Sequence, residues 1–167
     1  MTDAAKGNYN VNESPVRKNI RLHGYDYSSN GAYFITICVK DGRTILWQPD
    51  VGTHSVRPLS KTGIIVKTAI ENIFVIYNGV FIDCYTIMPN HVHMIVRIDN
   101  SGRTLCVPTI SRIIKQCKEY VTKQIGYSIW QTRFHDHIIR DEDEYQRIWQ
   151  YIDENPLKWI DDCYYIL

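Results

Sequence analysis

Long apolar runs are missing from this sequence of 167 residues. Its longest apolar stretches, at 63–66 and 73–77, fall far short of the roughly 20 residues that a membrane-spanning helix needs. The first 19 residues are polar and contain no apolar core, so we expect no secretory signal there. We therefore expect a cytoplasmic protein.

Cysteine pairs with metal-binding spacing are also missing. Five cysteines occur, an odd number, and no two of them form a C-x-x-C motif. Such scattered thiols are typical of a reduced intracellular protein rather than of a disulfide framework or a structural zinc site. The five are Cys38, Cys84, Cys106, Cys117 and Cys163.

Charge is nearly balanced over the whole chain, at +1, but its distribution is uneven. Seven Lys/Arg and two acidic residues lie between Arg103 and Arg140, whereas eight acidic and two basic residues lie between Asp141 and Asp162. The basic segment is compatible with a phosphate-binding face. It is equally compatible with a solvated helix face that the acidic segment balances.

No internal repeat, low-complexity run or second domain is recognisable, and the length suits a single core. Residues 1–23 are polar and without periodicity, so we expect a flexible N-terminal arm. Residues 24–167 are expected to form one domain.

Hydrophobic periodicity and turn residues predict the regular elements. Strands are predicted at 31–39, 80–88, 91–98 and 130–140, with a short one at 44–47, and helices at 61–77, 110–125 and 141–155. Ser60 and either Thr109 or Ser111 are predicted helix N-caps, and Pro156 is predicted to end the last helix. The element order predicts an α+β, ferredoxin-like βαββαβ sandwich, an antiparallel sheet with two helices on one face. The last helix is extra and can cross the open face.

A His-x-His motif, His91-Val92-His93, lies in the strand predicted at 91–98. Because side chains on a strand alternate between its faces, both imidazoles project from one face, about 7 Å apart along the strand. Two imidazoles so placed can share one divalent metal ion. Taken alone, the motif is more often a pair of half-exposed histidines at a sheet edge.

Tyr151 and Asn155 stand four residues apart on the last predicted helix and so share one of its faces. A tyrosine hydroxyl beside an amide oxygen is a plausible pairing of a nucleophile with a third metal ligand. Taken alone, Tyr151 is more often a packing residue. Together with the histidines, the pair fits phosphoryl chemistry, because a cation offsets charge on the phosphate while a tyrosyl ester stores the bond energy for rejoining.

Four segments resemble the single-tyrosine transposases that carry a His-hydrophobic-His motif. They are IRLHGYDYSSNGAYFITICVKDG (20–42), MPNHVHMIV (88–96), IWQTRFHDHIIRDEDEY (129–145) and YIDENPLKW (151–159). The similarity is greatest to the REP-associated tyrosine transposases, which act at repetitive palindromic hairpins. It implies that residues 24–167 form a transposase-like catalytic domain and that the protein is nucleoid-associated.

The resemblance implies a role for each motif residue. His91 and His93 correspond to metal ligands, Asn155 to the polar residue that completes the metal site, and Tyr151 to the nucleophile that forms a 5′-phosphotyrosine. The implied metal is Mg²⁺ or Mn²⁺, and the implied partner is single-stranded DNA with hairpin or palindromic repeats. The chain is expected to be a monomer or a homodimer.

DNA contacts are expected mainly from the basic helix and the loops around it. The candidate DNA-binding residues are Arg112, Lys115, Lys118, Arg133 and Arg140. His135 and His137 are further candidates for approaching the metal site or binding phosphate, and Trp130 for stacking on single-stranded DNA. A structural role is the commoner one for each of these three.

Three other readings stay open. In the first, the chain is a non-catalytic hairpin-DNA-binding module of the same fold. In the second, it is a metal-dependent hydrolase that uses water, and in the third, a relative of replication initiators and relaxases. A hydrolase needs a general base near the histidines, and no His-x-Glu or Glu-x-x-His partner occurs. Initiators and relaxases usually carry further domains, for which 167 residues leave little room.

Overall fold

The computed structural model describes residues 24–49, 58–101 and 108–165, so the predicted N-terminal arm lies outside the described residues. Four strands form one antiparallel sheet in the order β2-β3-β1-β4. They are β1 (Gly31–Cys38), β2 (Val80–Ile87), β3 (His91–Ile98) and β4 (His135–Ile139). This is the predicted α+β, ferredoxin-like arrangement, with β4 at one edge of the sheet.

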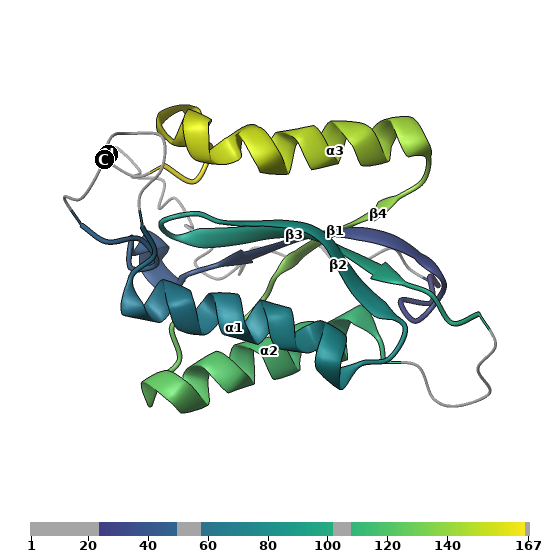
Figure 1. The fold of residues 1–167 in the computed structure, drawn as a ribbon, viewed down its shortest axis with the longest axis horizontal. Coiled ribbons are helices and arrows are strands. Elements are labelled where there is room, and N and C mark those ends of the chain that lie inside the picture. Colours follow the sequence, from purple (N-terminus) through teal and green to yellow (C-terminus); the bar gives the residue numbers. More distant parts are fainter. Residues whose placement is uncertain (1–23, 50–57, 102–107, 166–167) are drawn as a thin grey trace, which may run out of the picture.

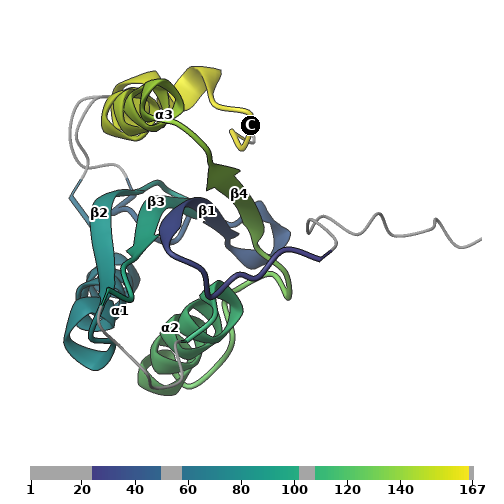
Figure 2. The same ribbon diagram turned by 90° about the vertical axis from the view of Figure 1, so that its right-hand side faces the viewer.

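Helices lie on both faces of the sheet. Helices α1 (Lys61–Ile76) and α2 (Ile110–Ile125) cover one face, and α3 (Glu142–Glu154) crosses the other, as predicted (Figures 1 and 2). Among the described residues, no helix is both long and apolar enough to cross a membrane.

The two faces of the sheet bury two separate cores. The larger core lies against α1 and α2 and includes Val92 and Met94 of β3. The smaller one lies under α3 and joins Ile95 of β3 to Ile139 and Ile152. Because side chains of a strand alternate, His91 and His93 share the α3 face with Ile95.

Side-chain caps fix where each helix begins. The hydroxyl of Ser60 accepts the N–H of Gly63, that of Thr109 accepts the N–H of Arg112, and a carboxylate oxygen of Asp141 accepts the N–H of Glu144. Each such cap satisfies an N–H that has no partner within the helix. The predicted caps at Ser60 and Thr109 are confirmed.

Two predictions about strands were wrong. Trp47 forms only an isolated bridge with Leu59, so 44–47 is not a strand. The strand predicted at 130–140 begins only at His135, because Trp130 pairs singly with Val39 before the chain leaves the sheet. The α-helix itself ends at Glu154, close to the predicted end, and Pro156 lies in the first turn of a 3-10 helix, η2 (Asn155–Asp161), where a missing N–H is tolerated.

A close backbone approach fixes the start of α1 to the turn that precedes His91. The N–H of Ser60 donates to the Leu46 carbonyl at 2.9 Å, and the N–H of Leu46 donates to the Pro89 carbonyl at 3.0 Å. A Cβ on Gly63 would overlap the carbonyl oxygen of Leu46. Only glycine therefore allows α1 to approach this loop so closely.

Gly63→Ala should destabilise the protein although alanine is the better helix former by about 1 kcal/mol. We expect the clash with Leu46 to lower the free energy of unfolding by roughly 2–3 kcal/mol, measured by urea denaturation. Lys67→Ala, at an exposed position of the same helix, should change it by less than about 0.5 kcal/mol. Wild-type stability in Gly63→Ala would show that the backbone at Leu46 moves aside without a measurable cost in free energy.

Candidate active site

The two histidines lie at the start of β3, directly after the turn that joins it to β2. In the sheet, His91 is opposite Cys38 and His93 is opposite Thr36 of β1. Both residues are buried, with 0% and 2% of their surface exposed. Their Nε2 atoms are 3.0 Å apart, so the side chains converge on one point.

Hydrogen bonds on the far side of each ring hold this orientation. The Nδ1 of His91 is 2.8 Å from Asn90 Oδ1, and the Nδ1 of His93 is 2.8 Å from Thr36 Oγ1. The Nδ2 of Asn90 donates to two carbonyls, so its Oδ1 must accept the proton of His91 Nδ1. The lone pair of His91 then lies on Nε2, directed at His93, as in metal-binding histidines oriented by a second hydrogen bond.

Burial lowers the pKa of His91 and of His93 to about 3. Both imidazoles are therefore neutral at neutral pH, which is the form that binds a metal ion. Asp162 adds a carboxylate to the pair, since the ligand atoms of the three residues all lie within 4.8 Å of one another. Sequence reasoning missed Asp162, because it counted this residue only within the acidic segment.

Helix α3 brings Tyr151 to the histidine pair of its own chain. The Oη of Tyr151 is 3.3 Å from Nε2 of His93, and its ring meets Phe34 edge-on. The side chain is 43% exposed, so a substrate can reach it. Burial of the hydroxyl and the nearby charge of Asp162 raise the pKa of Tyr151, which keeps the free phenol protonated at neutral pH.

Asn155 is only 3% exposed, and its Oδ1 is buried without a hydrogen-bond partner. An acceptor left unsatisfied in this way is destabilising unless another group satisfies it. Its backbone N–H donates to the carbonyl of Tyr151, so the two residues occupy successive turns, as the four-residue spacing predicts. The assignment of Asn155 as a metal ligand stays a prediction.

His135 and His137 lie on the edge strand β4, and both are exposed. His135 is opposite Thr36, which is opposite His93, so the three form one cross-strand row on the α3 face. His137 instead binds Glu144 of α3 through Nε2 at 2.7 Å. Neither joins the group formed by His91, His93 and Asp162 among the residues that the structure describes.

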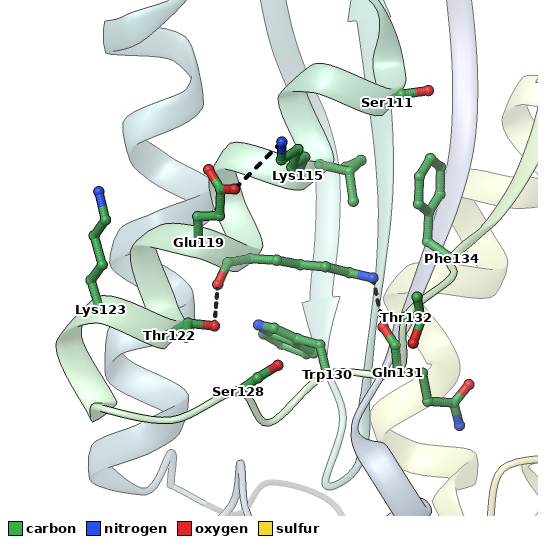
Figure 3. A pocket seen from close by; sticks show the side chains of 12 residues that line it. Ser111, Lys115, Glu119, Thr122, Lys123, Ser128, Trp130, Gln131, Thr132 and Phe134 are labelled. Carbon is green, nitrogen blue, oxygen red and sulfur yellow. Dashed lines mark hydrogen bonds and ion pairs between the residues drawn. The ribbon is translucent and has the colours of Figure 1, made fainter.

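A groove of about 770 Å³ lies on the α2 side of the sheet, between α2 and residues 128–134 (Figure 3). Lys115, Lys118 and Lys123 line it together with Trp130 and Phe134. The ammonium of Lys118 donates to the carbonyls of Gln131 and Arg133, and burial lowers its pKa to about 8.

The groove therefore contains two of the five candidate DNA-binding residues, Lys115 and Lys118. Arg112, Arg133 and Arg140 are exposed but do not line it. Arg133 precedes β4 and Arg140 follows it, so these two flank the edge strand. Sequence reasoning did not single out Lys123, although it is exposed in the last turn of the same basic helix.

The neutral histidines make stability depend on pH. With a folded-state pKa of about 3 and an ordinary value of 6.5, the unfolded chain binds more protons between these two pH values. The contribution of these two histidines to the free energy of unfolding is therefore fully present above pH 6.5 and is lost as the pH falls below that value. From pH 7.5 to 5.0, we expect each histidine to lower the free energy of unfolding by about 2 kcal/mol.

Urea denaturation in a chelator at the two pH values measures this loss. His91→Gln/His93→Gln should show a much smaller pH dependence, whereas His135→Gln, at an exposed position, should match the wild type. Equal pH dependence in wild type and the double variant would contradict burial of neutral imidazoles.

Comparison with known proteins gives relatives over most of the chain. A Haemophilus influenzae protein described only as uncharacterized is 34% identical over 171 residues, which covers 90% of this chain and 93% of that protein. A putative REP-associated tyrosine transposase from the same organism is 24% identical over 143 residues, covering 80% and 74%. No protein-family model matches the chain.

Among solved structures, that of a REP-associated tyrosine transposase bound to a REP hairpin has the same fold. It aligns with a TM-score of 0.63 and 24% identity, covering 83% of this chain and 74% of that one. The match to the transposase relative supports the resemblance to REP-associated tyrosine transposases that the sequence motifs indicate, and the solved structure shows that the fold is shared.

Proposed function

We propose that the chain cleaves and rejoins single-stranded DNA at hairpins, with Tyr151 as the nucleophile. One observation carries the proposal: the Oη of Tyr151 lies 3.3 Å from Nε2 of His93, beside two converging neutral imidazoles. A half-exposed hydroxyl held at a buried ligand pair is the arrangement that attack on a phosphodiester requires.

The reaction exchanges one phosphate ester for another. The Oη of Tyr151 attacks phosphorus, the bond from phosphorus to the 3′-oxygen breaks, and a 5′-phosphotyrosine and a free 3′-hydroxyl result. The phenol loses one proton and the departing 3′-oxygen gains one, so no net proton is consumed. Attack by a 3′-hydroxyl on the tyrosyl ester reverses these steps, and rejoining needs no external energy source.

His91, His93 and Asn155 are the residues that we propose to hold Mg²⁺ or Mn²⁺. The donors fit such an ion, because the Nε2 atoms of the two imidazoles converge and the buried Oδ1 of Asn155 has no hydrogen-bond partner. When bound, the ion supplies charge stabilisation at the phosphate oxygens. Asn90 and Thr36 keep the two rings in place through Nδ1.

Hairpin DNA is the proposed partner, and the fold shared with a transposase bound to a REP hairpin supports it. We assign phosphate contacts to Lys115, Lys118 and Lys123 of the groove, with further contacts from Arg112. The groove is on the α2 side and Tyr151 on the α3 side, so the strand must pass the edge strand β4 to reach the tyrosine. Arg133 and Arg140 are placed at the two ends of that strand.

Tyr151→Phe should abolish a covalent protein–DNA adduct while leaving hairpin binding within about twofold. The substrate is single-stranded hairpin DNA from the protein's own genomic neighbourhood, labelled at its 3′ end so that the 5′-linked fragment keeps the label. Adducts are resolved on a denaturing gel with Mn²⁺, with Mg²⁺ and with a chelator. The wild type should form an adduct only with a metal ion.

Tyr145→Phe is the matched control, because it removes a hydroxyl from the same helix at a residue bound to Asp83 rather than to the histidines. It should retain the adduct. An adduct in Tyr151→Phe would assign the nucleophile elsewhere. A wild type that binds the hairpin but forms no adduct would instead be a non-catalytic binding module.

Lys115→Ala/Lys123→Ala should weaken hairpin binding roughly tenfold at 0.1 M salt. The slope of log K against log [salt] should become shallower by about one to two. The reason is the loss of phosphate contacts in the groove. Titration by fluorescence anisotropy at several salt concentrations measures both effects. Lys67→Ala on α1, outside the groove, should bind like the wild type, and an unchanged salt slope in the double variant would exclude the groove as a phosphate site.

A further inference from the structure

The segment after α3 returns to the histidines and covers them. Its residue Asp162 has a side chain only 2% exposed, and Oδ2 lies 3.9 Å from Nε2 of His91. Asp162 is the carboxylate that completes the group of three ligand atoms within 4.8 Å. The proposed metal ligands lie on strand β3 and at Asn155, the first residue of η2, whereas Asp162 directly follows the end of η2.

Several contacts fix the position of Asp162. Its Oδ1 accepts the N–H of Tyr164 at 2.7 Å, and the Tyr164 carbonyl accepts the Nδ2 of Asn90, also at 2.7 Å. The ring of Tyr164 packs on that of His91, with centroids 4.5 Å apart. The same Asn90 therefore orients His91 and anchors the segment that carries Asp162.

Within the ranges that the structure describes, no Lys or Arg forms an ion pair with Asp162, and its carboxylate faces the imidazole of His91 instead. A buried carboxylate without a cation is destabilising, and a divalent ion between it and the two imidazoles would remove that penalty.

We propose that Asp162 is an anionic ligand of the metal centre, supplied by the segment that follows the tyrosine helix. This inference rests on the proposed function for the identity of the ion as Mg²⁺ or Mn²⁺. Carboxylate oxygens are the ligands that these hard ions prefer, and they shift the site away from the softer ions that imidazole and amide groups also admit. Metal binding is then linked to docking of residues 162–165.

The decisive experiment measures Mn²⁺ affinity rather than activity. Full-length wild type, Asp162→Asn and Asp161→Asn are titrated with Mn²⁺, and free ion is followed by electron paramagnetic resonance. Asp162→Asn keeps the shape of the side chain and removes its charge, so affinity should fall about tenfold or more. Asp161→Asn changes the adjacent, exposed aspartate and should stay within about twofold. Wild-type affinity in Asp162→Asn overturns the proposal.

A measurement on the wild type decides the matter if Asp162→Asn fails to fold in chelator. Mg²⁺ should slow hydrogen exchange at the Tyr164 amide, because that N–H is bound to Asp162. An exchange rate unaffected by saturating Mg²⁺ overturns the proposal. Asp162-dependent Mn²⁺ binding without any Tyr151 adduct would remove the proposed cleavage and keep this inference, and an adduct with Asp162-independent binding would do the reverse.

Discussion

The amide of Asn90 is the connection on which the site depends. Its Oδ1 accepts from His91, while its Nδ2 donates to the carbonyls of Gly42 and Tyr164. One side chain thus joins the turn after β1, the first histidine and the C-terminal segment. Because each of its polar atoms is engaged, rotation of the amide would leave an acceptor facing two carbonyls, and this fixes the tautomer of His91.

A second set of contacts determines where the tyrosine lies. Helix α3 buries Ile152 against Ile95 of β3, and the hydroxyl of Tyr145 donates to Asp83 of β2 at 2.9 Å. Asp83 also pairs with Arg97 of β3 through two hydrogen bonds. Because Ile152 directly follows Tyr151, its burial sets the rotation of the helix at Tyr151, whereas the Tyr145 contact holds only the first part of the helix to the sheet.

Local spacing accounts for what the sequence could predict. Strand alternation places His91 and His93 on one face, and a four-residue interval stacks Tyr151 on Asn155, so these residues were found without a structure. Asp162 could not be found in this way, because it depends on a 3-10 segment that continues through Pro156 and folds back over the sheet. Trp130 likewise has a strand-like sequence, yet the chain leaves the sheet beside it and forms the groove instead.

The charge of the site explains why a cation matters for the proposed chemistry. The groups around Tyr151 are two neutral imidazoles, a neutral phenol and the carboxylate of Asp162, and α3 itself begins with three acidic residues. A phosphodiester is negative, so these groups alone repel it. The candidate DNA-binding side chains lie instead on α2 and at the ends of β4. In the proposed reaction, the groups that bind DNA and the groups that do the chemistry are therefore separated, and a divalent ion held at the histidines would reverse the sign of the field where the phosphate meets Tyr151.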